Sequence, residues 1–304
     1  MQTWAWISII ATLALSLGVD LFVHRRGRAT TARSASIWTV IWVSVGIAFG
    51  AVVYAFRGAA AVPDYYAAYL IEESLSVDNL FVFLIIFQGL RVPLDLEHHV
   101  LFLGVLGALV FRALFVLAGA AALERWQWVS YVFGAILVIA AIRAARSQPG
   151  EGDNPLIHWL SEHLPVSKGF AGRKFVTVEN GRRLATPLLI ALVGLEISDV
   201  FFAIDSVPAA LSISRDQFVV YSSNALAICG LRSLFLVLRS LLRGLPHLHY
   251  GIAAVLLFTG LKMISHPWVD IPSWVSILVS ASCIGLAVLA SLRAKRDEAP
   301  SPSA

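Results

Sequence analysis

Apolar residues along the chain occur in blocks of about 20, separated by short polar or basic segments. A helix of about 20 apolar residues is long enough to cross the hydrocarbon core of a bilayer. The blocks predict nine spans, at residues 4–23, 36–56, 67–89, 98–121, 127–145, 186–211, 217–239, 248–264 and 272–292. We therefore expect an all-α fold, a polytopic helical membrane bundle.

Composition supports this class of protein. Hydrophobic residues make up 58% of the 304 residues and charged residues only 14%, whereas soluble domains carry about 25% charged residues. These values exclude a soluble globular domain, a disordered chain and a disulfide-rich module. Cys229 and Cys283 lie in apolar blocks without CxxC spacing, so neither a redox site nor a zinc site is expected.

The net charge of +4 predicts orientation rather than a nucleic-acid partner, because basic residues of membrane proteins concentrate in cytoplasmic loops. If the N-terminus is outside, most of the 23 Lys and Arg residues fall in inner loops and the tail. We expect a multi-pass protein of the plasma (inner) membrane, with the N-terminus outside and the C-terminus in the cytoplasm.

An internal duplication relates the third to fifth spans to the sixth to eighth. The aligned pairs are Glu72 with Asp199, Asp78 with Asp205, Arg112 with Arg232, and Tyr131 with Tyr250. Three spans per unit is an odd number, so the two units must have opposite orientations in the membrane. Inverted repeats are a transporter architecture, with the site where the repeats meet.

The predicted organisation has five parts. These are two N-terminal helices (1–66), a first three-helix repeat (67–145), a cytoplasmic loop (146–185), a second, inverted repeat (186–264), and a last helix with a disordered tail (265–304). In the loop, Asn180–Gly181 between alternating runs predicts a β-hairpin. The loop is either a docking surface for a soluble partner or a plain connector.

Six carboxylates lie within the third and sixth spans. A charged group at the centre of a membrane helix costs about 2.5–3.5 kcal/mol, so most of them must face the bundle interior, water or one another. At about 100° per residue, Glu72 and Asp78 are separated by about 240° and cannot point to one place from a straight helix. Pro208 is predicted to bend or open the sixth span near Asp205. Asp20 is expected to be a boundary residue of the first span.

The polar groups near these acids are carboxylate, amide and hydroxyl oxygens, which suit hard divalent cations such as Mn²⁺, Mg²⁺ or Ca²⁺. The candidate metal ligands are Glu73, Asp78, Asn79, Glu196, Asp199, Asp205 and Ser206, and the supporting residues are Glu72, Ser76, Arg112, Asn224, Arg232 and Pro208. Six carboxylates less two arginines leave a formal −4. We expect some acids to bind protons when the metal is absent, which suggests metal–proton exchange. The two arginines are interpreted as buried counter-charges that hold the acids in place.

Two long acidic motifs resemble those of the TerC family of integral membrane proteins. They are Glu73-Ser-Leu-Ser-Val-Asp78-Asn79-Leu-Phe-Val-Phe and Glu196-Ile-Ser-Asp199-Val-Phe-Phe-Ala-Ile-Asp205-Ser-Val-Pro208-Ala; Asp20-Leu-Phe-Val-His24, Asn154-Pro155 and Thr186-Pro-Leu are further matches. The resemblance implies a relative of small cation exporters, associated with manganese efflux and homeostasis and, by name, with tellurium resistance. Mn²⁺ is then the transported substrate, with no permanently bound cofactor and no enzymatic activity. A tellurium oxyanion is a poor cargo for a negative cavity, so such resistance would be indirect.

Two alternatives to transport are considered. One is a non-transporting membrane component of a metal-stress or tellurite-resistance complex, which docks partners through the long loop. A scaffold has no need of a duplication or of deep acids. The other is an intramembrane aspartyl protease, but the contexts of Asp78 and Asp205 lack the glycine-flanked signature of that class.

Overall fold

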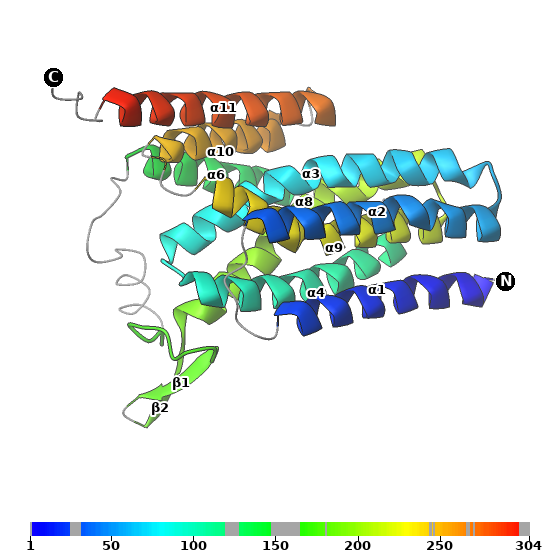
Figure 1. Ribbon diagram of the computed structural model, residues 1–304, viewed down its shortest axis with the longest axis horizontal. Coiled ribbons are helices and arrows are strands. Elements are labelled where there is room, and N and C mark those ends of the chain that lie inside the picture. Colours follow the sequence, from blue (N-terminus) through cyan, green and yellow to red (C-terminus); the bar gives the residue numbers. More distant parts are fainter. Residues whose placement is uncertain are drawn as a thin grey trace, which may run out of the picture.

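The computed structural model describes residues 2–24, 32–118, 128–146, 165–179, 181–242, 245, 247–265, 268–269 and 271–297. These residues form a bundle of long helices lying side by side, with one small hairpin at an end of the bundle (Figure 1). The helices are α1 (Gln2–His24), α2 (Ala32–Arg57), α3 (Ala61–Gly89), α4 (Leu94–Ala118), α6 (Trp128–Arg146), α8 (Pro187–Ile213), α9 (Gln217–Leu241), α10 (Leu248–Ser265) and α11 (Ser273–Asp297). The nearly all-α fold expected from the apolar blocks is confirmed.

Helix ends differ from the predicted spans where local chemistry extends the helix beyond the apolar block. The third helix begins at Ala61, because Pro63 in its first turn is compatible with a helix start. The last helix continues to Asp297, so the expected disorder from Ala294 onward is wrong for residues 294–297. Residues 298–304 and the Asn154–Pro155 motif lie outside the described residues.

Five of the described helices are long and apolar enough to cross a membrane. Their apolar segments are Thr3–Phe22, Arg33–Arg57, Leu94–Ala118, Pro187–Ile213 and Gln217–Ser240. Helix α3 has 29 residues but carries Asp64, Glu72, Glu73 and Asp78. Helices α10 and α11 contain shorter apolar segments. A multi-pass membrane protein follows from these helices, and nine crossings stay a prediction.

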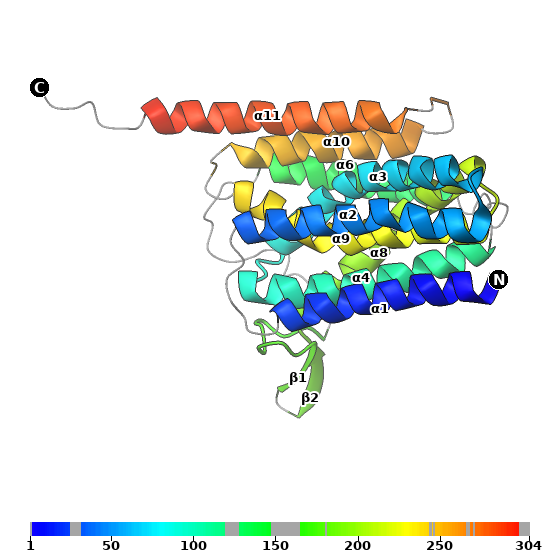
Figure 2. The same cartoon turned by 45° about the vertical axis from the view of Figure 1, so that its right-hand side comes forward.

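Successive helices run in alternating directions along the bundle. The first helix begins at one end, and α11 finishes at the opposite end (Figures 1 and 2). The hairpin projects at the end where α11 finishes. An odd number of alternating helices produces this separation of the two termini.

Helix packing pairs the two predicted repeats. Each helix of the first repeat packs against its counterpart in the second, namely α3 on α8, α4 on α9 and α6 on α10. Contacts between helices that are not counterparts also come in symmetric pairs. Helix α3 packs on α9, and its counterpart α8 packs on α4; likewise α3 packs on α10, and α8 packs on α6. A two-fold axis would generate this set of contacts. The inverted repeat itself stays a prediction from the alignment.

The crossing of α6 and α10 depends on two glycines. A Cβ atom on Gly134 would lie 2.8 Å from the Gly260 carbonyl oxygen, and one on Gly260 would lie 2.7 Å from the Gly134 carbonyl oxygen. Small residues allow membrane helices to approach this closely. The backbones therefore meet directly where the third helices of the repeats cross.

Helix α8 contains Pro208 and continues as an α-helix from Pro187 to Ile213. The helix therefore does not open near Asp205, and the predicted bend there stays a prediction. In a bundle, neighbouring helices can compensate the hydrogen bond that a proline removes, so the helix continues. The side chain of Asp205 lies outside the described residues, although its backbone belongs to α8.

The hairpin expected at Asn180–Gly181 is present. Strands β1 (Val176–Glu179) and β2 (Arg182–Ala185) are antiparallel, with Glu179 opposite Arg182. Gly181 has φ of 75°, a conformation that glycine adopts without strain. Asn180 lies outside the described residues, and a role in partner binding stays a prediction.

Candidate cation site

A buried guanidinium lies at the meeting point of four helices. Arg112 of α4 is 0% exposed and donates to oxygen atoms of α3, α8 and α9. Its Nη1 donates to Asn224 Oδ1 at 2.7 Å, to Ser206 Oγ at 3.3 Å and to Glu72 Oε1, and its Nη2 donates to Asp199 Oδ1 at 3.4 Å. We call these five residues the Arg112 cluster.

Polar stripes on α3 and α8 supply the acidic side of the cluster. Glu72, Ser76 and Asn79 lie on one face of α3, because spacings of four and three residues return to the same face of a helix. Asp199 and Ser206, seven residues apart, share a face of α8. These five side chains are buried, and α3 packs on α8. Glu72 and Asn79 are the aligned counterparts of Asp199 and Ser206, so the repeats contribute equivalent faces.

Several side-chain oxygens of α3 and α8 have no hydrogen-bond partner in the described part of the chain. The buried unpartnered atoms are Glu72 Oε2, Glu73 Oε2, Ser76 Oγ, Asn79 Oδ1, Glu196 Oε2 and Asp199 Oδ2. An unsatisfied buried polar atom costs about 1–3 kcal/mol, and native proteins contain few of them. Four of these atoms, on Glu72, Ser76, Asn79 and Asp199, belong to the stripes of two packed helices, and they indicate a place for water or a cation.

Glu196 extends this acidic region toward α4. Its carboxylate lies against Gly107, where a Cβ atom on residue 107 would collide with it. Glu196 precedes Asp199 by three residues, so the two carboxylates lie on neighbouring positions of α8. Gly107 thus leaves the room that the Glu196 carboxylate occupies between α4 and α8.

Glu73 faces a different neighbour from Glu72. Its Oε1 would lie 3.9 Å from a Cβ atom on Gly230 of α9, and Trp42 of α2 lies 3.7 Å from the same point. Glu73 is therefore next to the α2–α3–α9 contact rather than within the Arg112 cluster.

Asp78 lies in a second polar group, on the side of α3 that faces α10 and α11. Ser280 donates to Asp78 Oδ1 at 3.1 Å. Lys262 of α10 acts electrostatically on Asp78 and donates from Nζ to Ser276 Oγ at 2.7 Å. The angle of about 240° between Glu72 and Asp78 explains this separation.

The predicted ligand set therefore divides. The structure brings Asp199 and Ser206 together with the supporting residues Glu72, Arg112 and Asn224, while Glu196 lies beside them. Asp78 is directed elsewhere. Among the described side chains, no three His, Cys, Asp or Glu residues come together as metal ligands. The metal-binding role of all seven residues stays a prediction.

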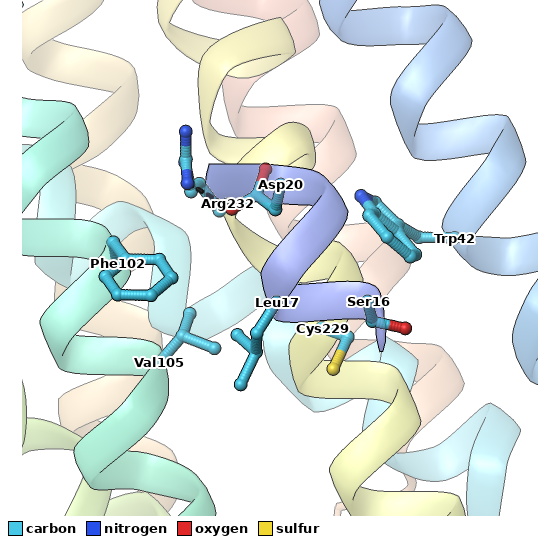
Figure 3. Close-up of a pocket in the computed structure, with 8 residues that line it drawn as sticks. All are labelled: Ser16, Leu17, Asp20, Trp42, Phe102, Val105, Cys229 and Arg232. Carbon is cyan, nitrogen blue, oxygen red and sulfur yellow. Dashed lines mark hydrogen bonds and ion pairs between the residues drawn. The ribbon is translucent and has the colours of Figure 1, made fainter. Parts of the chain in front are cut away.

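The second buried arginine has a different partner. Arg232 of α9 forms an ion pair with Asp20 of α1, beside a narrow pocket with room for about one water molecule. Figure 3 shows the residues that line this pocket, which are Ser16, Leu17, Asp20, Trp42, Phe102, Val105, Cys229 and Arg232. Asp20 lies near the end of α1, as expected from the sequence, and it is also buried. An arginine within a span requires a counter-charge at a similar depth, and that requirement could have identified Asp20.

Comparisons with known proteins agree on one family. The sequence profile described as "Integral membrane protein TerC family" matches residues 57–299. A Myxococcus xanthus protein named "Uncharacterized membrane protein STKORF319" is 43% identical over 300 residues, which cover 97% of this chain and 92% of the relative. The Escherichia coli (strain K12) protein named "Putative membrane-bound redox modulator Alx" is 36% identical over 285 residues, covering 90% of this chain and 89% of the relative.

A third relative, "Uncharacterized membrane protein" of Rickettsia bellii, is 32% identical over 287 residues, with 93% of this chain and 94% of the relative covered. No solved structure matches the chain. The profile match covers most of the chain, including α3, α4, α8 and α9, which build the Arg112 cluster. The chain belongs to the TerC family of integral membrane proteins.

Proposed function

We propose that the protein is a membrane transporter that exports a divalent metal cation, Mn²⁺ ahead of Ca²⁺ and Mg²⁺, from the cytoplasm. One observation carries the proposal: buried oxygens of α3, α8 and α9 converge on a single positive group, Arg112. Inside a membrane bundle, ionisable side chains are costly and mark the paths of ions and substrates.

The charge of this region favours a dication. Glu72 and Asp199 together carry two formal negative charges against the single charge of Arg112, and each has a second, unpartnered oxygen. Glu196 adds a further carboxylate beside Asp199. Carboxylate, amide and hydroxyl oxygens are the ligands that hard divalent cations prefer. The preference for Mn²⁺ and the outward direction come from the family resemblance.

The position of the cluster also suits transport. It lies where α3 and α4 meet α8 and α9, the first two helices of each predicted repeat. Transporters with inverted repeats hold their substrate at such an interface and expose it alternately by moving one unit against the other.

Flux through the purified protein in liposomes tests the proposal. We expect uptake or release of Mn²⁺, compared with Mg²⁺ and Ca²⁺, and a loss of about tenfold or more in Asp199→Asn and Glu72→Gln, because each removes a buried negative charge. Asp95→Asn is the matched control, since Asp95 is an exposed carboxylate at the start of α4. The proposal would be contradicted if the native chain carried no dication. It would also be contradicted if Asp199→Asn and Glu72→Gln each carried as much Mn²⁺ as the native chain.

Asp78 and Asp205 are part of the same proposal, as central acids of the two repeats. Replacement of either by Ala should abolish efflux and leave membrane insertion intact, and normal efflux from both variants would remove them from the pathway. Coupling to protons is tested in the same vesicles. Metal flux that does not respond to an imposed pH gradient would exclude metal–proton exchange.

The scaffold alternative rests on the hairpin, which projects from the helices to one side, below α1 and α4 in Figure 2. Val178 on β1 is 65% exposed, so a partner could reach it. Deleting residues 156–180 separates the two functions. A scaffold would lose its function in cells, whereas a transporter would keep its flux in liposomes.

A further inference from the structure

We infer that Arg112 is the resident cation of the empty transport site, and that an arriving dication must displace its guanidinium. This inference rests on the proposed function and concerns how the same site is regulated. It gives Arg112 more than the structural role expected from the sequence, because the guanidinium then competes with the metal.

The contacts of Arg112 are those of an ion among ligands. Pairs of arginine and carboxylate are frequently two-pronged, with two parallel hydrogen bonds to one carboxylate. Arg112 instead contacts one oxygen from each of four side chains, which are two carboxylates, an amide and a hydroxyl. All four acceptors are oxygens of the kind that hard dications bind.

The guanidinium satisfies this site incompletely. Its own Nε is buried without a hydrogen-bond partner in the described part of the chain, as are Glu72 Oε2 and Asp199 Oδ2. A metal ion bound between the two carboxylates could use both of these oxygens. The existing contacts therefore hold the acids together while leaving ligand atoms available to a competing cation.

The aligned arginine of the second repeat also has an unpartnered Nε, but it contacts a different acceptor. Arg232 is also buried, but its ion pair is with Asp20 of α1, outside the repeats. The arginine of the first repeat therefore binds acids of both repeats, and the arginine of the second repeat binds an acid of α1. The Arg232–Asp20 pair is a matched control, because it is a buried ion pair at the aligned position.

When the metal leaves, the return of the Arg112 guanidinium would again neutralise part of the negative charge of Glu72 and Asp199. Buried charges without a partner are strongly destabilising, so the empty protein would otherwise change conformation with difficulty. Removing the guanidinium should therefore strengthen metal binding and slow net efflux. Exchange of one metal ion for another should continue, since the site then stays filled.

The experiment measures ⁵⁴Mn²⁺ binding to the purified full chain by equilibrium dialysis, and flux in liposomes. The variants are Arg112→Gln, Arg112→Lys and the neutralised control Asp20→Asn/Arg232→Gln. We expect Arg112→Gln to bind Mn²⁺ roughly tenfold tighter or more than the native chain, because a nearby unit charge is removed. Arg112→Lys should be intermediate, since an ammonium lacks the planar fork of a guanidinium. The control should bind as the native chain does.

Net ⁵⁴Mn²⁺ efflux by Arg112→Gln should fall about tenfold or more, while its Mn²⁺–Mn²⁺ exchange persists. If Arg112→Gln does not fold, Arg112→Lys serves as the test, and it should also bind Mn²⁺ more tightly than the native chain does. Native or weaker affinity in the folded Arg112 variants overturns this inference alone, because the native chain would still bind. Absence of binding in the native chain and in every variant overturns the proposed function and this inference together.

Discussion

Arg232 of α9 and Asp20 of α1 form a buried ion pair that joins the first helix to the second predicted repeat. The aligned Arg112 binds acids from both repeats. Helix α1 thus supplies the counter-charge for one of two related arginines, which leaves the acids of α3 and α8 with a single guanidinium. The pair therefore contributes to the stability of the bundle, while Arg112 supplies the positive charge beside Glu72 and Asp199.

Replacing Asp20 by Asn should destabilise the folded protein by about 3–5 kcal/mol, because it leaves Arg232 buried without its counter-charge. The double variant Asp20→Asn/Arg232→Gln should recover most of this loss, since neither charge then remains. Thermal unfolding in detergent of the native chain, the two single variants and the double variant measures the coupling between the residues. Additive losses would show that the two residues are not coupled in solution.

Gly107→Ala should weaken Mn²⁺ binding by about 10- to 100-fold, the effect expected when a ligand loses its support. The added Cβ collides with the Glu196 carboxylate, which must move. Stability should change little, because the displaced atoms are the far end of a flexible side chain. Gly104→Ala is the control: its Cβ would meet the Leu195 side chain at 3.3 Å and no carboxylate. Equal Mn²⁺ affinity of the two variants would show that Glu196 does not contribute to the cation site.

Periodicity and length predict most of the fold, because a membrane helix must satisfy its own backbone and bury an apolar surface. The hairpin was also predictable, since Asn180–Gly181 encodes a local turn. The site was predictable only in part. Helical geometry shows that Glu72 and Asp78 diverge, but it cannot say that one meets Arg112 and the other Ser280.

Those partners are separated in sequence by 40 residues for Glu72 and by 202 for Asp78. The choice of partner depends on how whole helices pack, which no local pattern encodes. Asp20 is different, because the need of Arg232 for a counter-charge at a similar depth points to it although 212 residues separate the two. At Pro208 the local rule allows either a bend or an opening of the helix, and the helix continues to Ile213 without opening.

Gly134→Ala should destabilise the bundle by about 1–3 kcal/mol, because overfilling a close contact forces the backbones apart. The added Cβ would lie 2.8 Å from a backbone oxygen of α10, which cannot rotate away as a side chain can. Gly285→Ala on α11 is the matched control, since its Cβ would meet no described atom within 4 Å apart from its chain neighbours and the backbone of its own helix. The control should be neutral or more stable by up to about 1 kcal/mol. Thermal unfolding in detergent measures both, and equal midpoints would contradict the close crossing of α6 and α10.

The orientation in the membrane predicts which sites react with an impermeant thiol reagent. After Cys229 and Cys283 are replaced by Ser, Val178→Cys in the hairpin should react only in permeabilised cells, because basic loops stay in the cytoplasm. Ala59→Cys, between α2 and α3, should react in intact cells, because that connection lies at the opposite end of the bundle (Figure 1). The reverse pattern would place the N-terminus inside and invert the proposed direction of transport across the structure. Reaction of both sites from one side would contradict the alternation of the helices, and with it the membrane-spanning arrangement on which the cation site depends.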